Sequence, residues 1–155
     1  MTGNDQWRER VAEERGAIGG LEVLPFGLLI FVVGMLLVLN AWAVVDAKLT
    51  AEAAAREAGR AYAESASGPA AAEAARQAAA EAVSGAGRDP GRLRVSGESA
   101  AFVRCAVVTV RTSYEVPALT LPFIGGFGDG IDVHGEHRER IDAFRAGLGP
   151  EQNCG

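Results

Sequence analysis

The sequence predicts an α+β membrane protein: one long N-terminal transmembrane helix that continues into a stalk, a second Ala-rich helix, and a small antiparallel sheet of about three strands. Three observations carry this prediction. An apolar run from Leu24 to Val45 contains no charged residue, an Ala-rich stretch follows it, and from Arg92 onward apolar and polar residues alternate as in a strand. The 155 residues leave room for one membrane helix and one small soluble module.

The apolar run lies between Glu22 and Asp46 and is long enough to cross a bilayer. At about 1.5 Å per residue, a helix of this length reaches roughly 30 Å, the thickness of a hydrocarbon core. A cleaved secretory signal is the alternative, because Ala41-Trp42-Ala43 has the small-x-small form of a cleavage site. The run is longer than an ordinary signal core and its polar leader is not basic overall, which favours a permanent span.

The predicted orientation has the N-terminus inside. Three arginines precede the span, and Lys48, Arg56 and Arg60 follow it closely, so the positive-inside rule alone does not decide the orientation. No basic cluster follows the span, and the cysteines favour an exported C-terminal part. We therefore predict a single-pass protein of the cytoplasmic (inner or plasma) membrane, with a cytoplasmic leader at residues 1–16 and the C-terminal domain outside.

The membrane helix is expected to continue into water without a break, because no strong helix breaker separates the apolar run from the Ala-rich stretch. Residues 17–67 thus form one helix, with the span at about 24–45. It is expected to stop at Gly68-Pro69, since glycine followed by proline is a common helix end. A second helix, Ala70–Val83, then falls within a segment 68–90 that also contains a linker.

Alternating polarity predicts a β-rich extracytoplasmic head at residues 91–145. One face of its longest strand is apolar and the other polar, which is typical of a sheet with one solvated side. The stretch after that strand is rich in Gly and Pro and is expected to be a loop, although an unusually apolar one. The expected elements are, in order, a strand that begins at Leu93, a strand Phe102–Val116, a loop Pro117–Gly130, a strand Gly130–Ile141 and a flexible tail 146–155.

The two cysteines, Cys105 and Cys154, have two open interpretations. If the head is outside the cytoplasm they can form a disulfide, which would close a loop of about 50 residues and stabilise the fold by roughly 4 kcal/mol in the chain-entropy model. Alternatively they are two unlinked thiols, because Cys154 lies in a Gly- and Pro-flanked tail.

The sequence contains no pattern that predicts catalysis, so we expect a non-enzymatic protein without metal or cofactor. His134 and His137 are three apart on a predicted strand and point to opposite faces, which disfavours a shared metal ion. A nucleophile elbow, a phosphate-binding loop and a zinc-protease motif are all missing. The formal net charge of −5 gives no basic footprint, so no nucleic-acid partner is expected.

The unusual features of the sequence lie at the predicted membrane. Glu22 stands at the margin of the span, where an unpaired carboxylate in hydrocarbon would cost on the order of 3 kcal/mol. It is either a simple charged flank or the partner of a positive group on a neighbouring chain. Small residues recur every seven positions, and a polar side chain lies deep in the run, which suggests a face for helix packing. The residues of this face are Gly20, Gly27, Gly34 and Ala41, with Asn40 beside them.

These features resemble the TadE-like pseudopilins of tight-adherence (Flp-type) pilus assembly systems. Arg15-Gly16 followed by Glu22 and the apolar run is similar to the family's Arg-Gly, small residues, Glu, apolar signature. The segment 54–61 (AAREAGRA) is similar to the Ala-Ala-Arg-Glu-(Gly/Ala)-Ala-Arg-Ala segment that follows the span in the family. The strand that ends at Val116-Pro117, the apolar loop and the next strand resemble the family's C-terminal sheet.

The resemblance implies that a prepilin peptidase cuts the leader after a glycine and that Glu22 neutralises the new α-amino group of an adjacent subunit. The Gly-to-Glu spacing is atypical. Cutting after Gly16 makes Glu22 the sixth residue of the mature chain, whereas cutting after Ala17 makes it the fifth, as in the family. An uncleaved, permanently anchored form is a third alternative.

The expected function is that of a minor, type IV pilin-like pseudopilin in a Flp-type pilus assembly or secretion system. Its expected partners are other pilins or pseudopilins in homo- or hetero-oligomers, the inner-membrane pilus platform, the prepilin peptidase and membrane lipid. The alternative is a single-pass, membrane-anchored extracytoplasmic binding module unrelated to pili, with the loop from Phe123-Ile124 to Phe127 as its contact surface.

Overall fold

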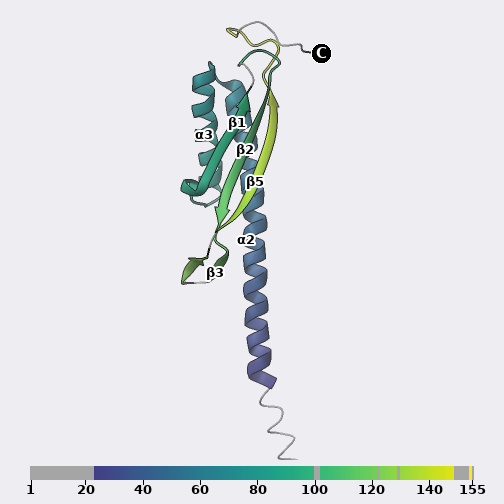
Figure 1. Cartoon of the computed structure of the whole chain (residues 1–155), viewed down its shortest axis with the longest axis vertical. Helices are drawn as coiled ribbons and strands as arrows, with labels where there is room; N and C mark the ends of the chain where they lie inside the picture. The colour runs from purple at the N-terminus through teal and green to yellow at the C-terminus, as the bar shows by residue number, and fades with distance from the viewer. Residues whose placement is uncertain (1–22, 100–101, 122, 129, 149–153, 155) are drawn as a thin grey trace, which may run out of the picture. The chain divides into compact units, whose positions relative to one another are not determined.

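A computed structural model describes residues 23–99, 102–121, 123–128, 130–148 and 154 of the chain (Figure 1). The chain separates into two compact units, residues 1–40 and residues 41–155, and each is described by itself. The boundary falls inside a helix, so the second unit contains the C-terminal part of that helix, a second helix and all of the strands.

Two helices contain most of the described residues before position 86. Helix α2 runs over Val23–Glu64 and helix α3 over Gly68–Gly85, which confirms one long apolar N-terminal helix and a second Ala-rich helix. The expected stop of the first helix at Gly68-Pro69 was wrong, because Pro69 lies in the first turn of α3. Proline is favoured there, since the first helical N–H groups have no partner within the helix.

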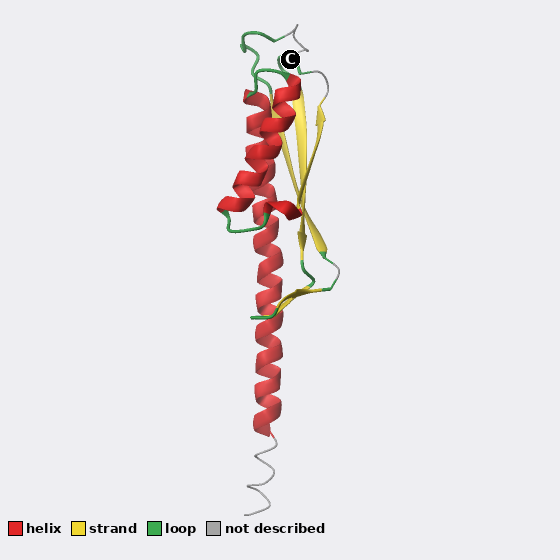
Figure 2. Cartoon of the chain, turned by 90° about the vertical axis from the view of Figure 1, so that its left-hand side faces the viewer, coloured by secondary structure: helices red, strands yellow, loops and turns green. Residues whose placement is uncertain are grey.

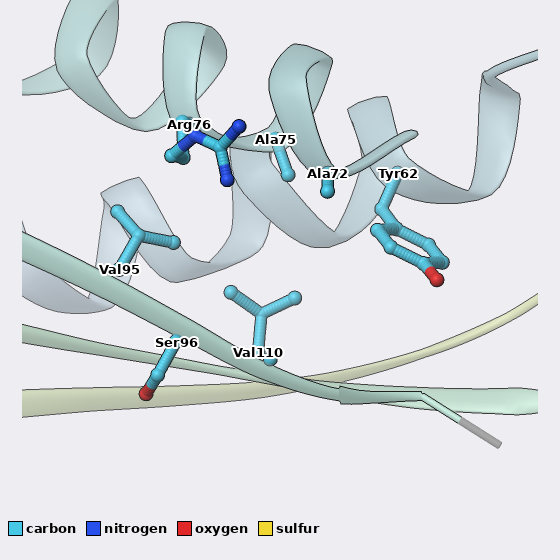
Figure 3. A pocket seen from close by; sticks show the side chains of 8 residues that line it. Tyr62, Ala72, Ala75, Arg76, Val95, Ser96 and Val110 are labelled. Atoms are coloured by element: carbon cyan, nitrogen blue, oxygen red, sulfur yellow. The ribbon is translucent and has the colours of Figure 1, made fainter. Parts of the chain in front are cut away.

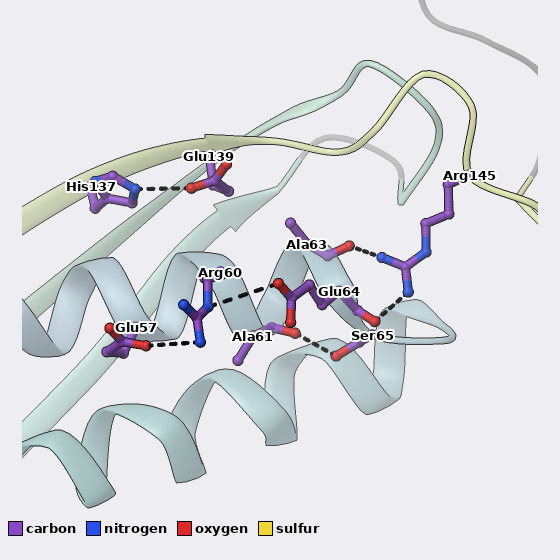
Figure 4. A network of polar contacts seen from close by, with 9 residues as sticks. All are labelled: Glu57, Arg60, Ala61, Ala63, Glu64, Ser65, His137, Glu139 and Arg145. Carbon is purple, nitrogen blue, oxygen red and sulfur yellow. Dashed lines mark hydrogen bonds and ion pairs between the residues drawn. The ribbon is translucent and has the colours of Figure 1, made fainter.

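The C-terminal end of α2 is capped from a distant part of the chain. The guanidinium of Arg145 donates hydrogen bonds to the carbonyl oxygens of Ala63 and Glu64, as Figure 4 shows. A cation at this end also compensates the negative pole of the helix dipole. An arginine far along the sequence therefore satisfies carbonyl groups at the end of α2 that have no partner within the helix.

Three strands form the antiparallel sheet that the sequence predicts. Strand β1 is Leu93–Ser99, β2 is Val107–Val116 and β5 is Ile131–Arg140, and their order in the sheet is β1-β2-β5. A 3-10 turn, η1 (Pro90–Arg92), leads into β1. Strand β2 begins later than Phe102, the expected start, because the chain turns at Cys105, whose φ of 62° is incompatible with a strand.

The stretch expected to be a plain loop contains a second, two-stranded sheet. Strand β3 (Leu119–Leu121) pairs with β4 (Gly125–Phe127), so the prediction of an entirely irregular Pro117–Gly130 was wrong. Between the two strands, the N–H of Ile124 donates a 3.3 Å hydrogen bond to the carbonyl oxygen of Leu121. Gly125, the first residue of β4, adopts a φ of 109°, a conformation that glycine adopts without a steric penalty.

Both helices cover the same face of the three-stranded sheet in the second unit (Figure 2). Strand β2 alternates strictly between buried and more exposed residues, and its buried side chains face the helices. Helix α2 contributes a stripe of alanines spaced four or three residues apart, each fully buried. The stripe is Ala47, Ala51, Ala54 and Ala58. Alanine buries little area, so this core depends on close approach rather than on large side chains.

Glycines allow strand β5 to contact the backbone of α2. A Cβ atom at Gly135 would lie 2.4 Å from the carbonyl oxygen of Ala51, and one at Gly59 would lie 2.9 Å from the ring of His137. On the neighbouring strand, the hydroxyl of Thr112 donates a 2.7 Å hydrogen bond to the same Ala51 oxygen. The helix and the sheet are therefore held at a separation that admits no side chain at Gly135.

We predict that Gly135→Ala destabilises the second unit by about 2 kcal/mol, because the added methyl group must push the strand away from the helix backbone. The matched control is Gly97→Ala in β1, where a Cβ atom would lie 3.9 Å from its nearest neighbour, the oxygen of Thr109. Pulse proteolysis of the full chain in detergent, across a urea gradient, measures both variants. Equal midpoints for the two variants would contradict the close contact.

Candidate functional site

The first unit presents an uncovered apolar helix surface. Its large side chains are exposed along the whole described length, among them Phe26 at 67 % and Ile30 at 71 %. Large apolar patches on a protein surface mark sites that contact lipid or another protein. By length and composition alone, helix α2 is able to cross a membrane. This surface is the first candidate functional site.

Glycine creates a hollow in this surface. Beside Gly34, an apolar depression is lined by Ile30, Phe31, Met35, Val38 and Leu39. Neither Gly34 nor Gly27 has any atom within 4 Å of the position that a Cβ would occupy. These two glycines are seven residues apart and therefore lie close to one face of the helix. A side chain or backbone from another helix can enter the depression, as in small-residue contacts between membrane helices.

Asn40 and Ala41 occupy the end of the predicted packing face. The side-chain amide of Asn40 donates a 2.8 Å hydrogen bond to the carbonyl oxygen of Leu36, four residues earlier in its own helix. Part of its hydrogen-bonding capacity is therefore used locally, and the interchain bond that we expected of it stays a prediction. Ala41 is exposed.

Four of the predicted site residues lie outside the described residues. These are the cleavage candidates Gly16 and Ala17, the first small residue of the packing face, Gly20, and the acidic residue Glu22.

In the second unit the structure joins Cys105 and Cys154 through a disulfide, with 5.3 Å between their Cα atoms. Cys105 lies in the turn before β2, next to Ile141, whose backbone exchanges hydrogen bonds with Cys105 and Ala106 at 3.0 and 2.9 Å. The cross-link thus ties the C-terminal tail to the end of the sheet where β5 finishes. Its role here is structural.

A polar groove of about 540 Å³ is lined by Lys48 of α2 and, on the sheet, by Arg94, Arg111, His134 and Glu136 together with small residues. Arg111 donates a 3.0 Å hydrogen bond to Glu136 and, with Arg138 nearby, lowers the pKa of that carboxyl group. Glu136 is therefore held by guanidinium groups rather than positioned as a base beside a nucleophile. The groove offers charge, but no catalytic arrangement is formed by the residues that line it.

A second cavity, of about 300 Å³, lies between α3, the end of α2 and strands β1 and β2 (Figure 3). Its walls are mostly apolar, and Tyr62, Arg76 and Ser96 are its polar members. Ser96 points away from the helices in Figure 3, and Arg76 pairs with Glu73 at 2.5 Å. The cavity is a gap left by small residues in the helix-to-sheet packing rather than a site with converging polar groups.

The two histidines do not converge on one site. His137 faces α2 and its Nε2 atom lies 3.1 Å from the carboxylate of Glu139 (Figure 4). His134 is exposed, and its backbone oxygen accepts a hydrogen bond from the ammonium group of Lys48. Among the described residues, no group of three or more His, Cys, Asp or Glu side chains is arranged to hold a metal ion.

The hairpin β3–β4 forms an exposed apolar tip, which is the second candidate site. Phe123 is fully exposed at 108 %, Ile124 at 70 % and Phe127 at 49 %. The sequence had indicated this stretch through its apolar composition, although it had not indicated its strands. The hairpin extends beyond the end of the three-stranded sheet at which β2 finishes and β5 begins (Figures 1 and 2).

Comparisons of the chain with protein-family models, with curated proteins and with solved structures found no significant match.

We predict that removal of the disulfide destabilises the second unit by about 4 kcal/mol, because the bridge spans 49 residues and restricts the unfolded chain. The urea midpoint of the wild-type chain in detergent is compared with that of Cys105→Ala/Cys154→Ala. A reductant should lower the wild-type midpoint and leave the double variant unchanged. Equal maleimide labelling of the wild-type protein before and after reduction would refute the bridge.

We predict that Gly34→Leu weakens association between copies of the full chain, or with partner spans, by about tenfold, because leucine fills the hollow that admits a second helix. Val32→Leu is the matched control, since a residue two positions away lies on the opposite side of the helix. The yield of cross-linked oligomers in native membranes measures both. A loss that is equal for the two variants would show that Gly34 has no special role.

Proposed function

We propose that this protein is a minor pseudopilin-like component of a tight-adherence (Flp-type) pilus assembly system, anchored in the cytoplasmic membrane by α2 with its second unit outside. The observation that carries the proposal is the uncovered apolar helix with a hollow at Gly34. A helix that only anchors a domain needs apolar length, whereas a helix that assembles with others also needs places for close approach.

The sequence resemblance supplies the second support. It covers the leader signature, the segment 54–61 after the span and the strand pattern of the head. In the second unit, the segment 54–61 has a clear physical role. Ala54, Ala55 and Ala58 are fully buried in it, and Arg60 lies within 4 Å of Glu57 and Glu64 on its exposed side. This division into a buried alanine face and a charged face suits a stalk that packs against its own sheet.

In the proposed mechanism the span is the assembly surface. Subunits meet through the face that contains Gly20, Gly27, Gly34 and Ala41, next to the inner-membrane pilus platform. Glu22 pairs with the α-amino group that the prepilin peptidase creates on an adjacent subunit. Such a pair offsets the cost of a carboxylate at the hydrocarbon margin, and it forms only when two subunits are in register. The protein then acts without chemistry of its own.

Co-expression with a prepilin peptidase tests the proposal. We expect a product whose N-terminus is Ala17 or Ile18, found by intact mass measurement and N-terminal sequencing. A peptidase inactivated at its catalytic site is the control. An intact Met1 end, under conditions in which a known prepilin is cut, would exclude processing and would favour a permanently anchored binding module.

Glu22→Ala is expected to reduce co-assembly with partner pseudopilins about tenfold or more while leaving membrane insertion intact, because the variant cannot neutralise the partner's amine. Glu22→Asp keeps the charge and serves as the matched control. Co-purification from membranes measures assembly, and carbonate extraction measures insertion. Normal assembly of Glu22→Ala would contradict the charge-pairing role.

A further inference from the structure

We infer that the β3–β4 hairpin is a second membrane contact of this protein, whose tip at Phe123 and Ile124 inserts into the interfacial layer of the bilayer. The inference rests on one part of the proposed function, namely that α2 spans a membrane. It does not depend on pilus assembly or on cleavage of the leader.

The first step is the direction of strand β2 along α2 within the second unit. Near the middle of the strand, Thr112 donates its hydrogen bond to Ala51. Two residues further along the strand is Tyr114. The guanidinium carbon of Arg88 lies over its ring, 5.7 Å from the ring centroid. Arg88 in turn donates hydrogen bonds to the carbonyl oxygen of Ala43 at 3.1 Å and to the carboxylate of Asp46 at 2.6 Å. Strand β2 therefore runs toward the earlier residues of the helix.

The second step is the level at which the strand ends. Ala43 belongs to the apolar run, and Asp46 is the first charged residue after it. Tyr114 is thus level with the end of the run, and β2 continues to Val116 before the chain enters the hairpin. A strand advances about 3.3 Å per residue, so the hairpin begins at or beyond this level. In a chain whose apolar run spans the bilayer, this is the membrane surface.

The third step is the chemistry of the hairpin. Residues 117–128 contain no charged side chain, and three large apolar side chains, Phe123, Ile124 and Phe127, are exposed. Apolar and aromatic side chains are favoured on surfaces that dip into the headgroup boundary, where they leave water without entering the hydrocarbon core completely. Charged groups are favoured beside such a contact because they reach the headgroups. Asp46 and Arg88 lie next to Tyr114, near the end of β2 from which the chain enters the hairpin.

The fourth step is the backbone of the tip. Phe123 has a φ of 69°, the left-handed region that a bulky L-residue adopts only at a steric cost. Its ring is completely exposed, so packing within the described part of the chain does not compensate this cost. A glycine or asparagine would satisfy the turn more easily. A strained conformation that presents an aromatic ring outward is consistent with a contact made outside the chain.

Lipid is the occupant that these observations favour. A docking surface for a soluble partner is exposed to water whenever the partner is absent, whereas a tip at the membrane surface is covered by lipid at all times. The three-residue strands also offer little surface for a specific protein contact. The bilayer needs no shape complementarity, only an apolar tip at the right level.

Tryptophan fluorescence of the full chain in lipid vesicles tests the inference. In a Trp7→Phe/Trp42→Phe background, Phe123→Trp places a single reporter at the tip. Phe144→Trp is the matched control, because Phe144 is also an exposed phenylalanine, at 94 %, but follows the opposite end of β5, near Arg145 and the C-terminal end of α2. We expect brominated lipids to quench the reporter at position 123 and not at position 144. We also expect acrylamide to quench position 123 about threefold less than position 144, because an interfacial ring is shielded from water.

Each of the following results would overturn the inference. Equal acrylamide quenching at both positions, without an effect of brominated lipids, would show that the tip lies in water. Protection from acrylamide without quenching by lipid would show that a protein, such as a second copy of the chain, covers the tip.

A chain that keeps Trp42 as its single tryptophan reports on the span. Lipid quenching of Trp42 but not of position 123 would refute the hairpin contact alone, and quenching of neither would refute the span as well.

Discussion

The second unit depends on the contact between the alanine stripe of α2 and strands β2 and β5. At its centre, the carbonyl oxygen of Ala51 accepts a hydrogen bond from Thr112 and faces Gly135, where even a methyl group would not fit. Small residues on both sides bring helix and sheet into backbone contact, so that a core with few large side chains still excludes water. The register of the sheet relative to the helix follows from this contact.

Other features of the unit follow from that register. One end of the sheet is held by Arg145 on the last carbonyls of α2 and by the disulfide from Cys105 to Cys154. At the other end, Arg88 joins Tyr114 to Asp46 and Ala43. Within the second unit, these contacts hold the sheet against Ala43–Glu64 of α2 at both ends.

Both candidate sites are apolar surfaces of the described residues. On the outer sheet face Arg111 pairs with Glu136, and the helix-facing side of the sheet packs against the helices except at the cavity beside Tyr62. The two candidate sites, the hollow at Gly34 and the tip at Phe123, are exposed. Each would gain free energy from leaving water, and neither contains a group that could transfer a proton or attack a substrate.

Local signals were sufficient for several elements of this protein. The uncharged run Leu24–Val45 predicted a long apolar helix because length and polarity are properties of the sequence itself. The alternation along Val108 to Val116 predicted a strand with one buried face because the period of a strand is also local. Glycines at Gly27 and Gly34 marked one helix face for the same reason, since their spacing alone places them there.

Tertiary structure decided the features that depend on residues far apart in the chain. The last carbonyls of α2 accept hydrogen bonds from Arg145, and the turn at Cys105, beside Ile141, precedes the start of β2 at Val107. No local sequence pattern distinguishes Gly135. Only its contact with the backbone of Ala51 shows why a side chain is excluded there. The position of β2 along α2 is marked by Arg88, which lies against Tyr114 and donates hydrogen bonds to Ala43 and Asp46, more than 40 residues earlier in the chain. Such contacts carry no sequence period, because they arise only when the chain has folded.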